Sequence, residues 1–167
     1  MADTTKNLEA AFAGESQANR KYLAFAKKAD AEGQKGIAKL FRAAAAAETV
    51  HAHNHFNVLK GVGGTLDNLK AAFEGEHHEF TSMYPEFIDI AKKENNQEAL
   101  QSFYWANAVE KVHGELYQKA LESLKAGKDI AAKAFYVCDR CGYTIEDGAP
   151  DICPVCGAKK ELFSRID

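Results

Sequence analysis

The sequence lacks any apolar run of about 18 residues, so we expect no membrane-spanning helix. Its first seven residues are polar and lack the apolar segment of a secretory signal, which favours a cytoplasmic protein. The net charge of −3 provides no basic surface field, which argues against nucleic acid as a partner. These absences leave a small protein whose apolar content of 46% is enough to form a buried core.

Cysteine and proline are scarce through most of the chain. No cysteine precedes Cys138, and Pro85 is the only proline before residue 126. The last part holds all four cysteines and the other two prolines. In a reducing cytoplasm, clustered cysteines indicate metal binding rather than disulfides. We therefore expect a helical domain over residues 1–126, a linker at 127–134 and a small cysteine-rich domain at 135–167.

Residues 5 to 125 are rich in Ala, Glu, Lys, Leu and Phe and predict four helices. The expected helices run from about Thr5 to Glu32, Gly36 to Lys60, Thr65 or Asp67 to just before Asn95, and Gln97 to Ala126. Gly33, Gly61 and Gly127 are expected to end three of them. Thr65 or Asp67 can cap the third helix. Pro85 must distort that helix, because it has no N–H for the carbonyl of Thr81.

Each expected helix has an apolar stripe with a carboxylate within it. The five carboxylates on these stripes are Glu15, Glu48, Glu76, Glu79 and Glu110. One glutamate on an amphipathic helix is usually a solvated surface residue. Five that converge in one core are costly without cations, and the stripes carry no Lys or Arg. A pair of metal ions is the simplest source of that positive charge.

Two copies of Glu-x-x-His strengthen the metal interpretation. They are Glu48-Thr-Val-His51 and Glu110-Lys-Val-His113, and each follows an earlier glutamate, Glu15 by 33 residues and Glu76 by 34. Four-helix bundles use this arrangement to hold two iron or manganese ions in their core. Tyr22 lies two turns after Glu15 and can reach such a site as a hydrogen-bonding neighbour.

The cysteines form two Cys-x-x-Cys-Gly motifs, Cys138-Asp-Arg-Cys141-Gly and Cys153-Pro-Val-Cys156-Gly. Four thiolates give the tetrahedral coordination that suits zinc or iron. The motif predicts a four-cysteine metal site but does not distinguish the two metals. A structural zinc ribbon, which only stabilises its own short domain, is the alternative.

The combined motifs resemble those of the rubrerythrin family over essentially the whole chain. The segments that carry the resemblance are Glu15-Ser-Gln-Ala-Asn-Arg-Lys-Tyr22, Glu48-Thr-Val-His51, Glu74-Gly-Glu76-His-His-Glu79, Met83-Tyr84-Pro85, Glu110-Lys-Val-His113 and Tyr136-Val-Cys-Asp-Arg-Cys-Gly-Tyr143. The resemblance implies an all-α, ferritin-like four-helix bundle with a non-haem di-iron site. It also implies a C-terminal rubredoxin-like domain with one iron held by four cysteines.

The family's activity would be the reduction of hydrogen peroxide to water. Electrons would enter through the rubredoxin-like iron from a donor protein linked to NAD(P)H, as part of the defence against oxidative stress. By resemblance, Glu48 and Glu110 bridge the two irons and Glu15 binds one of them. The resemblance assigns the remaining ligands as Glu76 and His113 on the other iron, and Glu79 and His51 as an exchangeable pair. Tyr84 resembles a tyrosine near the family's site, although it needs the distortion at Pro85 to turn towards Glu79.

The connection between the second and third helices is too short for a ferritin-like bundle made from one chain. That fold needs these two helices to run parallel. The second helix is about 37 Å long at about 1.5 Å per residue, whereas Gly61 to Leu66 spans at most about 21 Å. Either all helices are antiparallel, or the first two helices of one chain pair with the last two of another. We expect the second arrangement, a swapped homodimer.

Two other classes of function compete with the peroxide reductase. A ferritin-like ferroxidase, which handles or stores iron, would explain the carboxylates but not the four-cysteine domain. A non-catalytic binding module with a zinc ribbon would explain the cysteines but not the carboxylates. An oxidase with a zinc-stabilised tail is a further alternative. Manganese in place of iron in the bundle also remains open.

Overall fold

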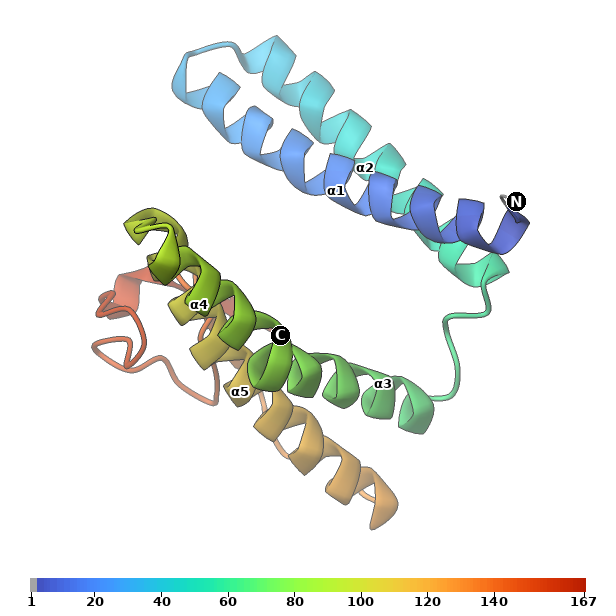
Figure 1. The fold of residues 1–167 in the computed structure, drawn as a ribbon, viewed down its shortest axis with the longest axis vertical. Coiled ribbons are helices and arrows are strands. Elements are labelled where there is room, and N and C mark those ends of the chain that lie inside the picture. Colours follow the sequence, from blue (N-terminus) through green and yellow to red (C-terminus); the bar gives the residue numbers. More distant parts are fainter. Residues whose placement is uncertain (1–2) are drawn as a thin grey trace. The chain divides into compact units, whose positions relative to one another are not determined.

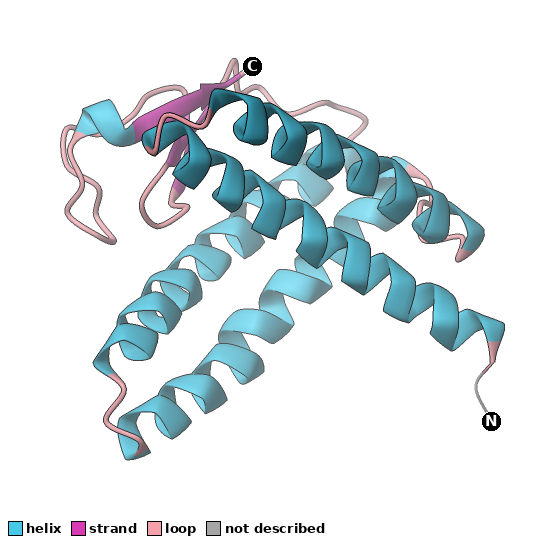
Figure 2. Cartoon of the chain, turned by 90° about the horizontal axis from the view of Figure 1, so that it is seen from above, coloured by secondary structure: helices cyan, strands magenta, loops and turns pink. Residues whose placement is uncertain are grey.

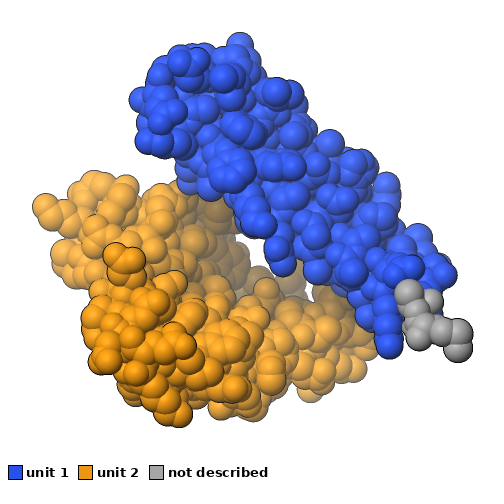
Figure 3. All heavy atoms as spheres, turned by 45° about the horizontal axis from the view of Figure 1, so that its top comes forward, with its two compact units in different colours: residues 1–63 blue, residues 64–167 orange. Residues whose placement is uncertain are grey.

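A computed structural model describes residues 3–167. The chain divides into two compact units, residues 1–63 and residues 64–167, drawn in blue and orange in Figure 3. Within the described residues, no helix combines the length and the low polarity that crossing a bilayer demands.

The first unit is a hairpin of two long helices, α1 (Thr4–Ala31) and α2 (Lys35–Val58), which lie side by side in Figure 1. The carboxylate of Asp3 caps α1 by accepting a hydrogen bond from the N–H of Lys6 at 2.9 Å. All the buried residues of α2 are alanines, and so are two of the three buried residues of α1. Their small side chains let the two helices approach closely. As expected, α1 ends just before Gly33, which has a φ of +78°.

Two expectations about helix ends were wrong. The second helix ends at Val58, and the left-handed residue is Lys60, with a φ of +57°, rather than Gly61. Gly61 is needed for space instead, because a Cβ there would overlap the ring of Phe56. The third helix is capped by the backbone of Gly64, so Thr65 and Asp67 both lie inside its first turn.

The second unit contains the other two expected helices. The third is built from α3 (Thr65–His78), a π-helical turn η1 (Glu79–Met83) and α4 (Tyr84–Lys93). The fourth, α5 (Gln97–Lys125), is capped by Asn96 and ends before Gly127, as expected. The expected distortion at Pro85 is confirmed, and it takes the form of the π-turn. The N–H of Tyr84 donates to the carbonyl of Glu79, five residues earlier. This bond forms the π-turn directly before Pro85, which has no N–H to donate.

The C-terminal residues of this unit form a small antiparallel sheet, magenta in Figure 2. Its strands are β1 (Phe135–Cys138), β2 (Thr144–Glu146) and β3 (Phe163–Ile166), with the order β2-β1-β3 and a short 3-10 helix, η2 (Lys160–Leu162), before β3. Cys138, Cys153 and Ala158 form its buried centre, with Tyr143 and Phe163 packed against them. This small domain contacts α5 through β2, which places the cysteines beside the helix that carries Glu110 and His113.

Candidate metal centres

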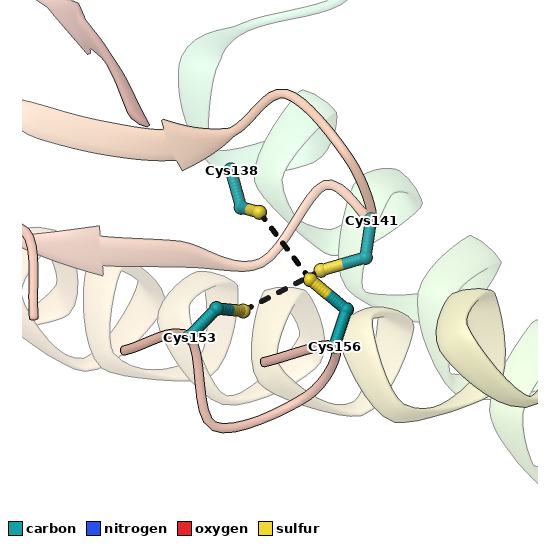
Figure 4. Close-up of side chains that lie close together, drawn as sticks. All are labelled: Cys138, Cys141, Cys153 and Cys156. Carbon is teal, nitrogen blue, oxygen red and sulfur yellow. Dashed lines mark hydrogen bonds between the residues drawn. The ribbon is translucent and has the colours of Figure 1, made fainter. Parts of the chain in front are cut away.

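The four cysteines converge on one point (Figure 4). The Sγ atoms of Cys138 and Cys156 are 3.6 Å apart, as are those of Cys141 and Cys153. These separations exceed the S–S bond length of about 2.05 Å, so the thiols are free. Four sulfurs around one ion, each at about 2.3 Å, would be about 3.8 Å apart. The spacing therefore fits one tetrahedral metal ion.

The backbone of each cysteine motif turns towards the sulfurs. The N–H of Gly142 donates to the carbonyl of Cys138, and the N–H of Gly157 donates to that of Cys153. Against the effect of burial, the N–H groups of Arg140 and Cys141 lower the pKa of the Cys138 thiol. Burial raises the pKa of the Cys141 thiol. A metal ion would remove this obstacle to ionisation, because it binds the thiolate form.

The first unit brings together Glu15 from α1 with Glu48 and His51 from α2. One ligand atom from each lies within 4.8 Å of the others. The Nδ1 atom of His51 is 2.7 Å from a carboxylate oxygen of Glu48, because three residues of helix place the two side chains on one face. Tyr22 lies outside this group and packs against the rings of Phe25 and Phe41.

A buried asparagine that the sequence analysis overlooked joins the two helices beside this group. Asn19 is 8% exposed. Its Nδ2 atom donates to the carbonyl of Ala45 at 2.7 Å and to the hydroxyl of Thr49 at 2.9 Å. Asn19 lies one turn after Glu15, and Thr49 directly follows Glu48. These bonds therefore fix the relative position of the two helices at the level of their carboxylates.

The second unit brings together Glu76 from α3 with Glu110 and His113 from α5, again within 4.8 Å. The Nδ1 atom of His113 is 2.8 Å from a carboxylate oxygen of Glu110 and 3.6 Å from one of Glu76. Burial and the negative charge of Glu110 raise the pKa of Glu76 to about 7. Among the described residues, His113 is the only basic side chain that forms an ion pair with either glutamate.

Glu79 and Tyr84 lie at the two ends of the π-turn, outside the group of three. Burial, followed by the charge of Glu110, raises the pKa of Glu79. Burial also raises the pKa of Tyr84, with smaller effects from Glu110, Glu79 and Glu76. Both side chains are therefore close enough to these carboxylates to respond to their charge, without being part of the tight group.

Thr144 is a neighbour of the site that helix periodicity could not reveal, because it comes from the small domain. Its Oγ1 atom is 2.9 Å from Nε2 of His113 and 3.0 Å from the carbonyl oxygen of Gly142. Near it, the side chains of Lys119 and Glu146 form an ion pair between α5 and β2. The small domain is therefore bonded directly to the helix that carries His113.

Chemically, the residues fit the metals that their types suggest. Carboxylate oxygens and imidazole nitrogens suit iron or manganese, and four thiolates suit iron or zinc. Each carboxylate group is partly buried and carries more negative than positive charge, so a divalent ion would compensate it.

Comparison with known proteins identifies both parts of the chain. A family model described as Rubrerythrin matches residues 6–121, and one described as the rubredoxin-like domain of rubrerythrin matches residues 136–164. The chain is 38% identical to Rubrerythrin-2 of Clostridium acetobutylicum, over 99% of this chain and 97% of that protein. It is 34% identical to nigerythrin of Nitratidesulfovibrio vulgaris, over 98% of this chain and 87% of that one.

The solved structures agree with the sequence matches. The structure of nigerythrin in a partially reduced state aligns with 99% of this chain and 87% of that chain, at a TM-score of 0.58 and 34% identity. The expected fold class, a ferritin-like helical protein with a small rubredoxin-like domain, is thereby confirmed. The chain has the candidate carboxylate–histidine site for two irons and the candidate four-cysteine site for one.

The raised pKa of Glu76 predicts how the stability of the metal-free protein depends on pH. Its folded value, about 7, lies above the ordinary value of 4.5, so the folded state binds this proton more tightly. Stability should therefore fall as the pH rises from about 4.5 to 7. The raised pKa of His113 acts in the same direction, since its favourable charge is lost as pH rises through its folded pKa. Thermal unfolding of metal-free protein between pH 5 and about 8 measures this slope.

The variant E76Q isolates the contribution of Glu76, because glutamine keeps the shape without the charge. E76Q should show a shallower loss of stability over that range, whereas E74Q, at an exposed position on the same helix, should match the unmodified protein. An equal slope in E76Q and the unmodified protein would contradict the assignment. Loading with metal should reverse the slope, since metal binding releases these protons.

Proposed function

The chain belongs to the rubrerythrin family, and we propose that it reduces hydrogen peroxide to water at a pair of irons. The observation that carries this proposal is the presence of two kinds of metal-binding group in one protein, with the domain of the four cysteines bonded through Thr144 to His113 of a carboxylate–histidine group. Peroxide reduction consumes two electrons and two protons, breaks the O–O bond and yields two water molecules. A protein with this task needs sites that store electrons and residues that deliver protons.

We propose that the irons are held by the ligands that the sequence indicates. The proposed ligands are Glu15, Glu48, His51, Glu76, Glu79, Glu110 and His113 for the di-iron site, and Cys138, Cys141, Cys153 and Cys156 for the single iron. When bound, two ferrous ions supply the two electrons and the Lewis acidity that polarises peroxide. The glutamates balance the charge of the metals, and the partly buried setting restricts access of water to the site.

Glu79 is the residue that we propose to deliver a proton. Burial and the charge of Glu110 raise its pKa, so its carboxyl group holds a proton closer to neutral pH than an ordinary glutamate does. While Glu79 is not bound to iron, its carboxyl group would give this proton to the departing peroxide oxygen. Tyr84, whose pKa is raised beside the same carboxylates, keeps its hydroxyl hydrogen and can donate a hydrogen bond there.

The rubredoxin-like domain is proposed to receive electrons from a donor protein linked to NAD(P)H. Its contact with α5 supports this role, because Thr144 follows the first cysteine motif by two residues and lies against His113. The family also supports peroxide and an electron donor as partners in general terms. Action in the cytoplasm would keep the four thiols reduced.

We propose that the complete di-iron site is shared between two copies of the chain. Among the described residues, each unit supplies one carboxylate–histidine group, and residues 59–64 connect α2 to α3. Six residues span at most about 21 Å, less than the length of α2. A swapped homodimer would pair Glu15, Glu48 and His51 of one chain with the ligands of the second unit of another.

Anaerobic stopped flow tests the proposed reaction. Fully reduced, iron-loaded protein is mixed separately with hydrogen peroxide and with oxygen, and absorption of both iron centres is followed. Peroxide should oxidise both centres quickly, and oxygen much more slowly. Faster oxidation by oxygen would favour an oxidase. A four-cysteine site that does not change colour would favour zinc in the small domain, and uptake of many irons per chain would favour ferritin-like storage.

Removal of the Glu79 carboxyl proton tests the proton-transfer step. General acids typically contribute about 10²-fold to 10⁴-fold to a rate. We expect E79Q to slow peroxide turnover by at least about 100-fold, while E74Q, an exposed neighbour on the preceding helix, stays near the unmodified rate. Iron content is measured alongside. An E79Q protein with both irons and full turnover would rule out the role.

Complementation tests the shared site. E48A removes a ligand of the first unit, and E110A removes one of the second, so each variant alone should hold fewer irons. In a swapped dimer, co-expression of the two variants forms a mixed dimer with one intact set of ligands. Iron and peroxidase activity should then return to about half of the normal level in the purified mixed dimer. No recovery would favour sites formed within one chain.

A further inference from the structure

The side chain of Thr144 makes two contacts that together determine its role. Its hydroxyl donates a hydrogen bond to the carbonyl oxygen of Gly142 at 3.0 Å. The same oxygen lies 2.9 Å from Nε2 of His113. A threonine hydroxyl has one hydrogen and two lone pairs. Because Gly142 already takes the hydrogen, Thr144 can only accept a hydrogen bond from His113.

This direction fixes which nitrogen of His113 carries hydrogen. Nε2 must be the N–H that donates to Thr144, so Nδ1 is the nitrogen left to bind a metal ion. Nδ1 is also the atom that faces the carboxylates, at 2.8 Å from Glu110 and 3.6 Å from Glu76. With a metal ion bound, Nδ1 would be unprotonated and would offer its lone pair beside those of the two carboxylates. In the metal-free protein, a proton on Nδ1 takes the place of that cation and forms the ion pair with Glu110.

The corresponding histidine of the first unit lacks this arrangement. His51 makes the same contact with its own Glu-x-x-His glutamate, at 2.7 Å. Among the described residues of that unit, no side chain bonds Nε2 of His51, and its side chain is 54% exposed against 27% for His113. The two copies of the motif therefore differ in what holds the imidazole.

We infer that Thr144 is a positioning residue for the metal site, which holds the His113 ring with Nδ1 directed at Glu76 and Glu110. It acts across the boundary between the small domain and α5. The inference rests on the proposed function only in taking Glu76, Glu110 and His113 as metal ligands. It does not depend on peroxide as the substrate.

The test compares T144V with T144S. Valine has nearly the shape of threonine and suits a strand, but it has no hydroxyl. Serine keeps the hydroxyl. The matched control is T65V, which makes the same change at an exposed position in the first turn of α3. The four-cysteine iron absorption and the helical circular dichroism show that each variant is folded.

Anaerobic titration with Mn(II), followed by the electron paramagnetic resonance of the free ion, measures the metal affinity. Mn(II) prefers oxygen and nitrogen ligands, so iron stays in the four-cysteine site. Loss of a hydrogen bond to a metal-binding histidine typically weakens affinity about 10-fold to 100-fold. T144V should lower the affinity for one of the two Mn(II) ions by about tenfold and leave the affinity for the other nearly unchanged. T144S and T65V should bind both ions like the unmodified protein.

Two results would overturn the inference. One is T144V protein that binds both Mn(II) ions with unmodified affinity. The other is T144S protein that binds Mn(II) as weakly as T144V does, which would assign the effect to packing rather than to the hydroxyl. Failure of the proposed function is a separate result. Protein that shows the expected Mn(II) pattern but does not reduce peroxide would reject the peroxidase and retain the role of Thr144.

Discussion

The partly buried carboxylates are the constraint on which the rest of the structure depends. Each unit gathers two glutamates and one histidine on facing helices, and within the described part of the chain no lysine or arginine forms an ion pair with these glutamates. In the second unit, burial and then the negative charge of Glu110 raise the pKa of Glu76 to about 7. Such a cluster costs folding free energy when metal is absent, and it binds a cation well for the same reason. The surrounding features hold the glutamates in register: Asn19 across the first pair of helices, and His113 across the second.

Two copies of one sequence motif have acquired different surroundings. His51 and His113 each contact the glutamate three residues earlier, as helix geometry requires. Among the described residues, His113 has a hydrogen-bond partner from the small domain, Thr144, because α5 lies against that domain, whereas the hydrogen bond found for His51 is the one to Glu48. A ring bonded at both nitrogens is restricted in rotation, whereas one bonded at a single nitrogen can still turn. The internal repeat of the sequence therefore does not imply that the two carboxylate–histidine groups behave alike.

Helix periodicity predicted most of the fold and which residues form the two groups of three candidate ligands, because the spacing of residues on a helix fixes which side chains share a face. It failed where the outcome depends on local packing. Lys60 rather than Gly61 takes the left-handed conformation, and the ring of Phe56 occupies the space beside Gly61. Pro85 predicted a distortion of the helix, but not its form. The π-turn arises because the backbone before Pro85 forms a hydrogen bond with a spacing of five residues. Thr144 was out of reach, because its partner lies 31 residues earlier in another domain.

The contacts between the small domain and α5 also bear on which function is favoured. A zinc-stabilised tail needs only to fold around its own metal and has no need of contacts with a helix. Ordering it against a helix costs conformational entropy that must be offset by contacts. Those contacts exist: the ion pair of Lys119 with Glu146, and the bond of His113 with Thr144. Since electron transfer slows steeply with distance, a domain that delivers electrons gains from this fixed position, and a storage protein does not. The docking of the small domain therefore supports the peroxide reductase over both alternatives.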